Sequence, residues 1–254
     1  MPPRLTTRLV PVALAVCFAT ALAPLLPAQD AAPRTVNADR PPGDIKLVQR
    51  LVADLGAADA SKRDDARVAL MGLRSKHLSV LRDAVRRSLP LAPSQRVVLQ
   101  EIVTQIVLAD QIYPTTPGGF LGIRLPSEMA ADERPLLGLE RGVSVLSRIP
   151  GFCSYRLLRE GDVIVGIVEQ PGEPIDSPRQ LIAAVLKAAA GQTLTFEVVR
   201  RAELIRVPIT LDAKPDFGGE VPSLNQFEND RAKLADDTWD RDFAPLFKDA
   251  DTVG

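Results

Sequence analysis

GGFLGIRL at residues 118–125 and REGDVIVGI at residues 159–167 determine how the middle of this 254-residue chain folds. In the first stretch, a glycine-containing turn leads into a run in which every second residue is apolar. This is the pattern of a strand with one buried face. In the second, a Gly-Asp turn leads into a continuous apolar run, which favours a fully buried strand. Both lie in a region, residues 117–212, where short β-type runs are separated by Gly and Pro. The sequence therefore predicts a β-rich module over these residues.

Further turns and a helix complete the pattern of this module. Ile149-Pro150-Gly151 forms a turn, and Ser177-Pro178 opens a helix, because proline suits the first helical position. Gly191-Gln192-Thr193 turns the chain into a strand over 194–200, and residues 204–211 return as its hairpin partner. In this order, the features resemble a PDZ domain of the type found in bacterial HtrA proteases, here without a recognisable protease domain. The resemblance implies a PDZ-like β-sandwich or barrel with two helices.

The resemblance also implies how the module binds a ligand. A PDZ domain adds the carboxyl-terminal tail of a partner as an extra strand, so main-chain hydrogen bonds give affinity and a side-chain pocket gives selectivity. Backbone amides of Leu121, Gly122 and Ile123 would hold the tail carboxylate, and an apolar pocket would accept an apolar last residue. The predicted peptide-binding residues are Leu121, Gly122, Ile123 and Leu125 after the glycine turn and Gln180, Leu181 and Ala184 in the helix. The alternative is that Leu121, Ile123 and Leu181 are core residues only and that the groove is closed.

Residues 44–112 have the pattern of a helical unit. Apolar residues recur at helical spacing, Asp44 is placed to cap a first helix, and Pro and Gly occur only at the breaks between helices. The segment 59–70 is similar to the start of a HEAT-type repeat, and the phase that begins at Ser61 restarts at Ser94. Two such helix pairs predict a compact four-helix unit. The expected fold class is therefore α+β multidomain, with a HEAT-like helical unit ahead of the PDZ-like module.

The amino terminus has the features of an export signal. Arg4 and Arg8 precede a stretch, residues 9–28, that contains no charged side chain. This order is typical of a secretory signal peptide, predicted here over 1–29 and followed by a Pro-containing linker over 30–43. The expected location is extracytoplasmic, periplasmic or secreted, in a bacterium. The alternative is an uncleaved membrane anchor formed by residues 9–28.

The carboxyl-terminal segment, residues 213–254, is acidic. From 214 onward it has ten acidic and five basic residues, with aromatic residues scattered among them. This composition predicts a flexible tail. The alternative is that the aromatic residues fold onto a partner or onto the rest of the chain.

Composition excludes several classes of function. The 31 basic and 32 acidic residues nearly cancel, which argues against nucleic acid as the partner. With two Cys and one His, a Cys/His zinc site and a disulfide framework are excluded, and we expect no metal or other cofactor. Loss of Cys17 with the signal peptide would leave Cys153 alone, and we expect an idle, buried thiol there.

The sequence lacks the motifs that would identify an enzyme. It has no Gly-x-Ser-x-Gly loop, no His-Glu-x-x-His and no phosphate-binding Gly-x-x-x-x-Gly-Lys, so we expect no catalytic residues. The predicted function is that of an exported, non-enzymatic scaffold or adaptor, whose partners are proteins with apolar carboxyl-terminal tails. Contact with a membrane is expected only if the amino-terminal segment is uncleaved. The alternative is a regulatory or substrate-delivery subunit of a separate extracytoplasmic protease or secretion system.

Overall fold

The computed structural model of the protein describes residues 44–126, 142–216 and 224–251. The predicted signal peptide (1–29), the alternative anchor (9–28) and the linker (30–43) lie outside the described residues. None of the helices in the described ranges combines the length and the hydropathy that crossing a bilayer requires.

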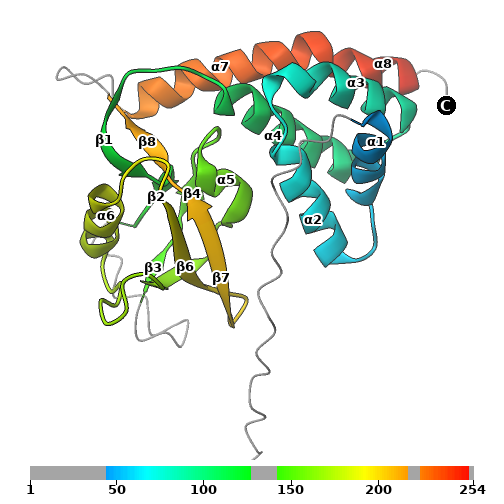
Figure 1. Ribbon diagram of the computed structural model, residues 1–254. Coiled ribbons are helices and arrows are strands. Elements are labelled where there is room, and N and C mark those ends of the chain that lie inside the picture. The colour runs from blue at the N-terminus through cyan, green and yellow to red at the C-terminus, as the bar shows by residue number, and fades with distance from the viewer. Residues whose placement is uncertain (1–43, 127–141, 217–223, 252–254) are drawn as a thin grey trace, which may run out of the picture. The chain divides into compact units, whose positions relative to one another are not determined.

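The residues ahead of the β-rich module form helices, as predicted. They are α1 (Ile45–Asp54), α2 (Ala60–Met71), the short 3₁₀ helix η1 (Ser75–His77), α3 (Leu78–Arg87) and α4 (Pro93–Ala109) (Figure 1). Asp44 caps α1 by accepting a hydrogen bond from the Lys46 amide at 2.9 Å, and Asp59 caps α2 through the Ser61 amide at 2.8 Å. Such a cap contributes about 1 kcal/mol to stability. The likeness of residues 59–70 to a HEAT-type repeat stays a prediction.

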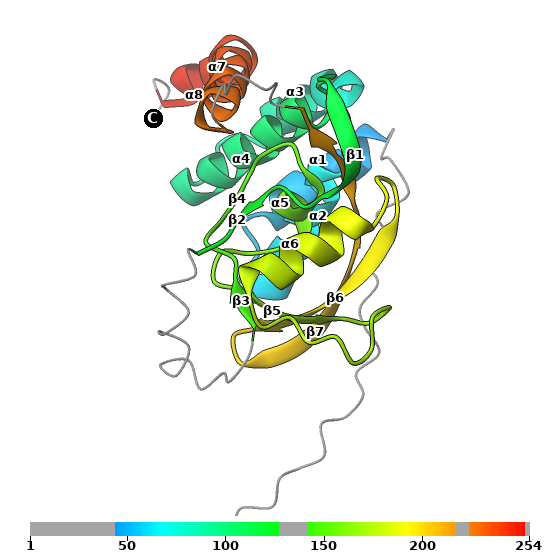
Figure 2. The ribbon, with the colours of Figure 1, turned by 90° about the vertical axis from the view of Figure 1, so that its left-hand side faces the viewer.

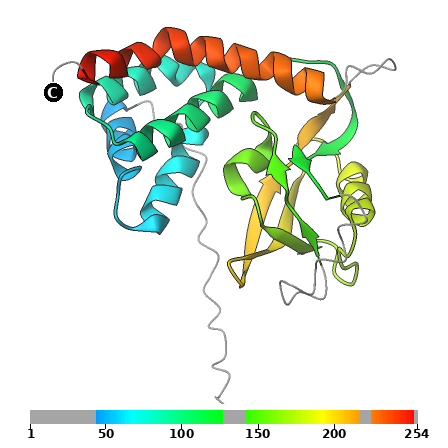
Figure 3. The ribbon, with the colours of Figure 1, turned by 180° about the vertical axis from the view of Figure 1, so that it is seen from behind.

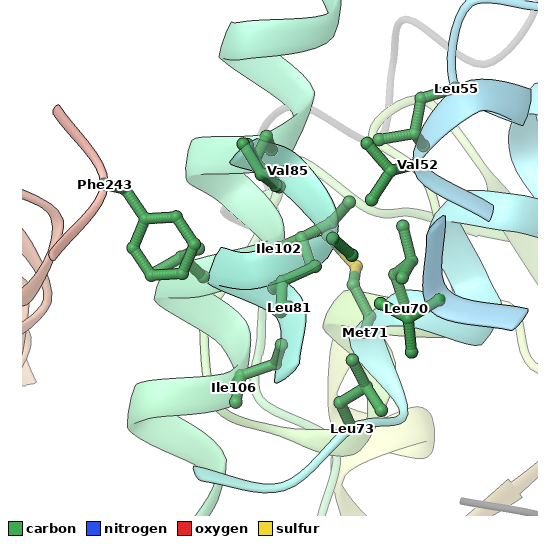
Figure 4. Close-up of a cluster of buried hydrophobic side chains, with 14 of the residues drawn as sticks. Val52, Leu55, Leu70, Met71, Leu73, Leu81, Val85, Ile102, Ile106 and Phe243 are labelled. Carbon is green, nitrogen blue, oxygen red and sulfur yellow. The ribbon is translucent and has the colours of Figure 1, made fainter. Parts of the chain in front are cut away.

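The core of this helical part is built mainly from aliphatic side chains. Val52, Leu70, Leu81 and Ile102 come from α1, α2, α3 and α4 in turn, and all four are fully buried. One aromatic side chain from far along the chain joins them: Figure 4 shows Phe243 pointing toward the helices that carry Leu81 and Ile102. Because a fully buried side chain of this size contributes about 1.5–3 kcal/mol, this cluster is a main source of stability.

The prediction of a flexible tail over 213–254 is wrong for most of that segment. Residues 224–251 form two helices, α7 (Leu224–Asp242) and α8 (Ala244–Asp251), and α7 runs along α4 (Figures 1 and 3). Trp239 stacks on Phe243 at 5.7 Å between ring centroids, and Phe243 and Phe247 are buried in the helical core. Burial of large aromatic surface outweighs the acidic composition, because the charged residues of α7 lie mainly on its exposed side. The helical unit therefore contains α7 and α8 in addition to the four predicted helices.

In its described residues, the β-rich module has three antiparallel sheets and two helices (Figure 2). One sheet has the order β3 (Val143–Ser144), β5 (Val163–Ile167), β6 (Thr193–Arg200), β7 (Glu203–Thr210). The others pair β1 (Thr115–Phe120) with β8 (Asp212–Pro215) and β2 (Ile123–Arg124) with β4 (Ser147–Arg148). The helices are α5 (Cys153–Leu157) and α6 (Pro178–Lys187). A second core lies among these elements, centred on Ile164, Leu181 and Phe196. The number of helices and the strands at both quoted stretches agree with the sequence analysis.

Because β1 and β8 are paired, the chain enters and leaves the module at one place. Thr115 lies opposite Pro215, so α4 leads into the module beside the point where the chain continues toward α7. The module is thus inserted between α4 and α7. In the sequence, one part of the helical unit precedes the module and the other part follows it. This arrangement positions the first turns of α7 near the start of the module.

Candidate functional site

Strand β2 has one paired edge and one edge that is open to a further strand. On the paired edge, the Leu146 amide donates to the Arg124 carbonyl at 3.0 Å, and the Ile149 amide donates to the Gly122 carbonyl at 2.7 Å. Because successive residues of a strand turn their peptide groups to opposite edges, the N–H and C=O of Ile123 face away from β4. Helix α6 lies on that side of β2 (Figure 1). Among the described residues, no strand pairs with this edge.

The end strand β7 offers a poorer template. Thr195 turns its peptide group toward β5, since its carbonyl accepts from the Val168 amide at 2.9 Å. Its partner in β7, Pro208, therefore lies in a pair that makes no mutual hydrogen bonds, and its peptide nitrogen faces the free edge. Proline has no N–H to donate, and its ring obstructs an incoming strand. The open edge of β2 is the better place for strand addition.

The turn ahead of β2 is held tightly from behind. Gly122 has a φ of +68°, a left-handed conformation that favours glycine, and a Cβ there would collide with the Phe152 side chain. The Gly122 carbonyl also accepts from the Ser154 hydroxyl at 3.1 Å. Glycine is therefore required at this position for both its backbone conformation and its close approach to Phe152.

The predicted pocket residues fall into two groups. Leu121 and Leu181 are only 4% and 1% exposed and belong to the core of the module. Ile123, Leu125 and Ala184 are half-buried and pack against the same core. Leu121 and Leu181 are thus core side chains, which is what the alternative prediction gave for these two residues. Ile123, Leu125 and Ala184 retain surface that a ligand can contact.

Gln180 lies at the first turn of α6 and is exposed. Its side-chain oxygen accepts from the Asp176 amide at 2.8 Å, while the Ser177 hydroxyl accepts from the Gln180 amide at 3.3 Å. Both side chains satisfy backbone amides at the helix start: Ser177 is the N-cap of α6, and Gln180 accepts from the residue that precedes this cap. The contacts of Gln180 are thus those of a helix cap.

Two apolar residues of α6 were missed by the sequence analysis. Ile182 and Leu186 are 48% and 40% exposed and lie one turn apart, on a stripe next to the buried Leu181 and Val185. Leu186 lies beside Gly118, where a Cβ would be 3.5 Å from its Cδ2 atom. The end of α6 is tied to the strand that leads into the glycine turn, since the Gly119 amide donates to the Ala188 carbonyl at 2.7 Å. The exposed side chain of Leu186 therefore lies close to the strand that leads into the turn.

Behind the turn lie the Cys153 thiol and the Asp212 carboxyl, which are in contact with each other. Burial raises the pKa of the Cys153 thiol well above its usual value, with nearby Asp212 adding to the effect, so the thiol is protonated at neutral pH. Its Sγ atom lies 3.5 Å from the Phe120 carbonyl oxygen, and its backbone amide donates to Asp212. Cys153 is partly buried, and a protonated thiol is a poor nucleophile. Within the described ranges, no group of three or more His, Cys, Asp or Glu side chains is placed to hold a metal ion.

Asp212→Asn should change how stability depends on pH. Burial raises the pKa of the Asp212 carboxyl, so the stabilisation from this group is fully present below its unfolded-state pKa and is lost as the pH rises through its folded-state pKa. Asparagine keeps an oxygen that can accept from the Cys153 amide and carries no charge. We expect the variant to gain stability relative to the wild type as the pH rises from about 4 to about 7, because only the wild type then carries a buried charge. Urea unfolding across that range measures the difference; Asp236→Asn, on the exposed side of α7, should show no such trend.

Comparison with known proteins finds similarity between part of the chain and HtrA-type PDZ domains. No protein-family model and no curated protein matches the sequence. The solved structures that match include the PDZ domain of HtrA3 bound to a phage-derived ligand, 24% identical over 39% of this chain and 91% of that chain, with a TM-score of 0.32.

Two proteases match over a smaller share of their own length. The HtrA-type protease AlgW with a decapeptide is 21% identical over 48% of this chain and 35% of that chain, with a TM-score of 0.34. A serine endoprotease from Yersinia pestis is 19% identical over 38% of this chain and 29% of that chain, with a TM-score of 0.30. This chain therefore spans about a third of the length of these two proteases. HtrA-type PDZ domains are what part of this chain is similar to.

Proposed function

We propose that this chain binds carboxyl-terminal or extended segments of partner proteins by adding them as a strand to the open edge of β2. The observation that carries the proposal is the orientation of Ile123, whose N–H and C=O face away from β4 and toward α6. An incoming backbone would pair with these groups, which supplies affinity without regard to sequence. The obstructed edge at Pro208 supports the choice of β2 over β7.

In this proposal, two sets of groups recognise the last residue of the ligand: one binds its carboxylate and the other contacts its side chain. The tail carboxylate is held by the amides at Leu121, Gly122 and Ile123, in a turn whose glycine is held from behind by Phe152. The last side chain of the ligand lies against Ile182 and Leu186 of α6. Because these side chains are apolar, the preferred last residue is apolar.

The wider role that we propose is that of a non-enzymatic scaffold or adaptor outside the cytoplasm. The export-type amino terminus and the lack of recognisable catalytic motifs in the sequence support this role. The inserted position of the module supports a fixed rather than a tethered display of the peptide site, because two chain connections join it to the helical unit.

A binding assay on the full chain tests the proposal. We expect a peptide with an apolar last residue and a free carboxylate to bind at least about tenfold more tightly than its amidated form, which is about 1.4 kcal/mol. Replacing both Ile182 and Leu186 by Glu should weaken binding of the free acid by at least about tenfold, since it removes apolar contact and adds repulsion of the carboxylate. Isothermal titration or fluorescence anisotropy measures both effects.

Ala183→Glu combined with Ala189→Glu is the matched control, because it adds the same charge at exposed positions in and just after α6. Binding that ignores amidation would contradict the carboxylate part of the proposal. Equal loss of affinity in the control would contradict the assigned contact surface, and a full chain that binds no peptide of either kind would contradict peptide binding itself.

A further inference from the structure

Arg231 of α7 is buried at a junction of several elements. Its guanidinium group lies over the rings of Tyr113, Phe152 and Phe227, at 5.8, 4.7 and 4.9 Å from the ring centroids. It also donates from Nη2 to the Leu108 carbonyl at 3.0 Å. A desolvated cation over several aromatic faces makes a strong contact. Arg231 therefore fastens the first half of α7 to the rings around Phe152.

Phe152 connects this junction to the glycine turn of the candidate site. Its side chain is buried, and it fills the space that a side chain at Gly122 would need. Its ring also meets the Phe120 ring edge-on, with 4.9 Å between centroids, one residue before Leu121. One side of Phe152 thus supports the turn, and Arg231 lies against its ring.

A second contact joins α7 to β2 itself. Glu228 accepts a hydrogen bond from Nη2 of Arg124 at 2.7 Å, and Arg124 directly follows Ile123. The contact is charge-assisted and its carboxylate is only partly exposed, so salt screens it less than an exposed ion pair. Glu228 and Arg231 lie three residues apart on one face of α7, so the same turn of helix touches both the strand and the support of its turn.

From these contacts we propose that Phe227, Glu228 and Arg231 of α7 are positioning residues for the peptide site. They hold Phe152 and Arg124, which in turn hold the turn at residues 121–123 and the start of β2. A turn that is held in its binding geometry before the ligand arrives loses less conformational entropy on binding, and so binds more tightly. The carboxyl-terminal helix is then part of the peptide-binding apparatus as well as of the helical core. This inference rests on the proposed function.

The other end of α7 makes the inference separable from folding. Trp239 and Phe243 anchor α7 and its continuation to the helical core, more than one turn beyond Arg231. Substitutions at Glu228 and Arg231 leave that anchor intact. A loss of positioning would change the geometry of the turn in a chain that is otherwise folded.

The test compares peptide binding by full-length variants. Arg231→Met keeps an unbranched side chain that can pack on the rings but removes the guanidinium with its charge and hydrogen bonds, and Lys233→Met is the matched control on the exposed side of α7. We expect Arg231→Met to weaken binding of an apolar free-carboxylate peptide about tenfold and to reduce its preference over the amidated peptide. Glu228→Gln should weaken binding about threefold, and Lys233→Met should have no effect. The ratio of the two dissociation constants is the decisive measurement, because partial unfolding lowers the binding-competent fraction equally for both peptides.

Amide hydrogen exchange of the ligand-free chain supplies a second measurement. Residues 118–126 should exchange faster in Arg231→Met than in Lys233→Met, while the helices α1 to α4 should exchange equally. If Arg231→Met fails to fold, the positioning role is tested with Glu228→Gln and with Arg231→Lys, which retains the charge. The measurements are again the ratio of the two dissociation constants and the exchange rates of residues 118–126.

The outcomes distinguish this inference from the function on which it rests. If the wild type prefers the free acid and folded variants at Glu228 and Arg231 keep that preference and the exchange rates, the positioning role is overturned and the peptide site stands. If the wild type itself binds neither peptide, the proposed function fails, and the positioning role fails with it.

Discussion

Phe243→Ala is expected to lower the free energy of unfolding by about 3–5 kcal/mol, although the residue lies in a segment with the composition of a disordered tail. The reason is that Phe243 has no exposed surface and packs among side chains from the other helices of the unit (Figure 4). Removing its ring leaves a cavity that the helices cannot fill. Because a domain is stable by only about 5–15 kcal/mol, the loss should be visible in urea or thermal unfolding followed by circular dichroism.

Leu234→Ala provides the control for this prediction. Leu234 lies on α7, the helix that directly precedes Phe243, but is 42% exposed, so its truncation should change stability by less than about 1 kcal/mol. Similar small effects for both substitutions would mean that α7 and α8 are not packed on the helical core in solution, and would restore the flexible tail.

Asp162→Ala is expected to lower the free energy of unfolding by about 3–5 kcal/mol. Asp162 is buried, and its two oxygens accept from Nε and Nη2 of Arg200 at 2.8 and 2.7 Å. The Arg159 amide donates to the same carboxylate at 2.7 Å. Removing the carboxylate leaves a partly buried guanidinium and a backbone amide without this acceptor, at the turn that begins β5. Equilibrium unfolding in urea measures the effect.

Glu197→Ala is the contrasting substitution. Glu197 pairs with Arg206 at 3.2 Å across β6 and β7, but both side chains are substantially exposed, so the pair contributes at most about 1 kcal/mol. An Asp162→Ala variant as stable as Glu197→Ala would show that the buried pair adds no more than a surface one.

Much of the fold was predictable because it depends on local patterns. The helical spacing at 44–109 follows from apolar stripes that four helices bury, and Asp44 caps the first of them. The turn before β5 and the buried run 163–167 follow from residues adjacent in the chain. The docking of α7 and α8 was not predictable from composition. It depends on a few aromatic residues meeting a core more than a hundred residues away, whereas the composition is an average over the whole segment.

The candidate site was predictable in its backbone and less so in its side chains. Gly122 lies in a turn that leads into a strand, as the sequence analysis predicted, and among the described residues no strand pairs with one edge of that strand. The side chains of α6 were harder, because Leu181 and Val185 form one apolar stripe and Ile182 and Leu186 form the next. Periodicity alone does not tell which of two adjacent stripes faces the core. The packing of the module assigns burial to the first stripe and leaves the second exposed.

The sequence by itself determined the central strands of the β-rich module, the helix that begins at Ser177-Pro178, their order and the glycine at the turn, since these follow from local preferences and side-chain periodicity. It placed neither α5 nor β8, most of which falls in the predicted tail. Only the tertiary structure decided which segments complete the helical core, which face of α6 is exposed, and that Arg231 lies behind the turn. The physical reason is that these features depend on contacts between residues far apart in the chain. Such contacts stabilise the fold by burying surface between two segments, so neither segment alone shows that the contact will form.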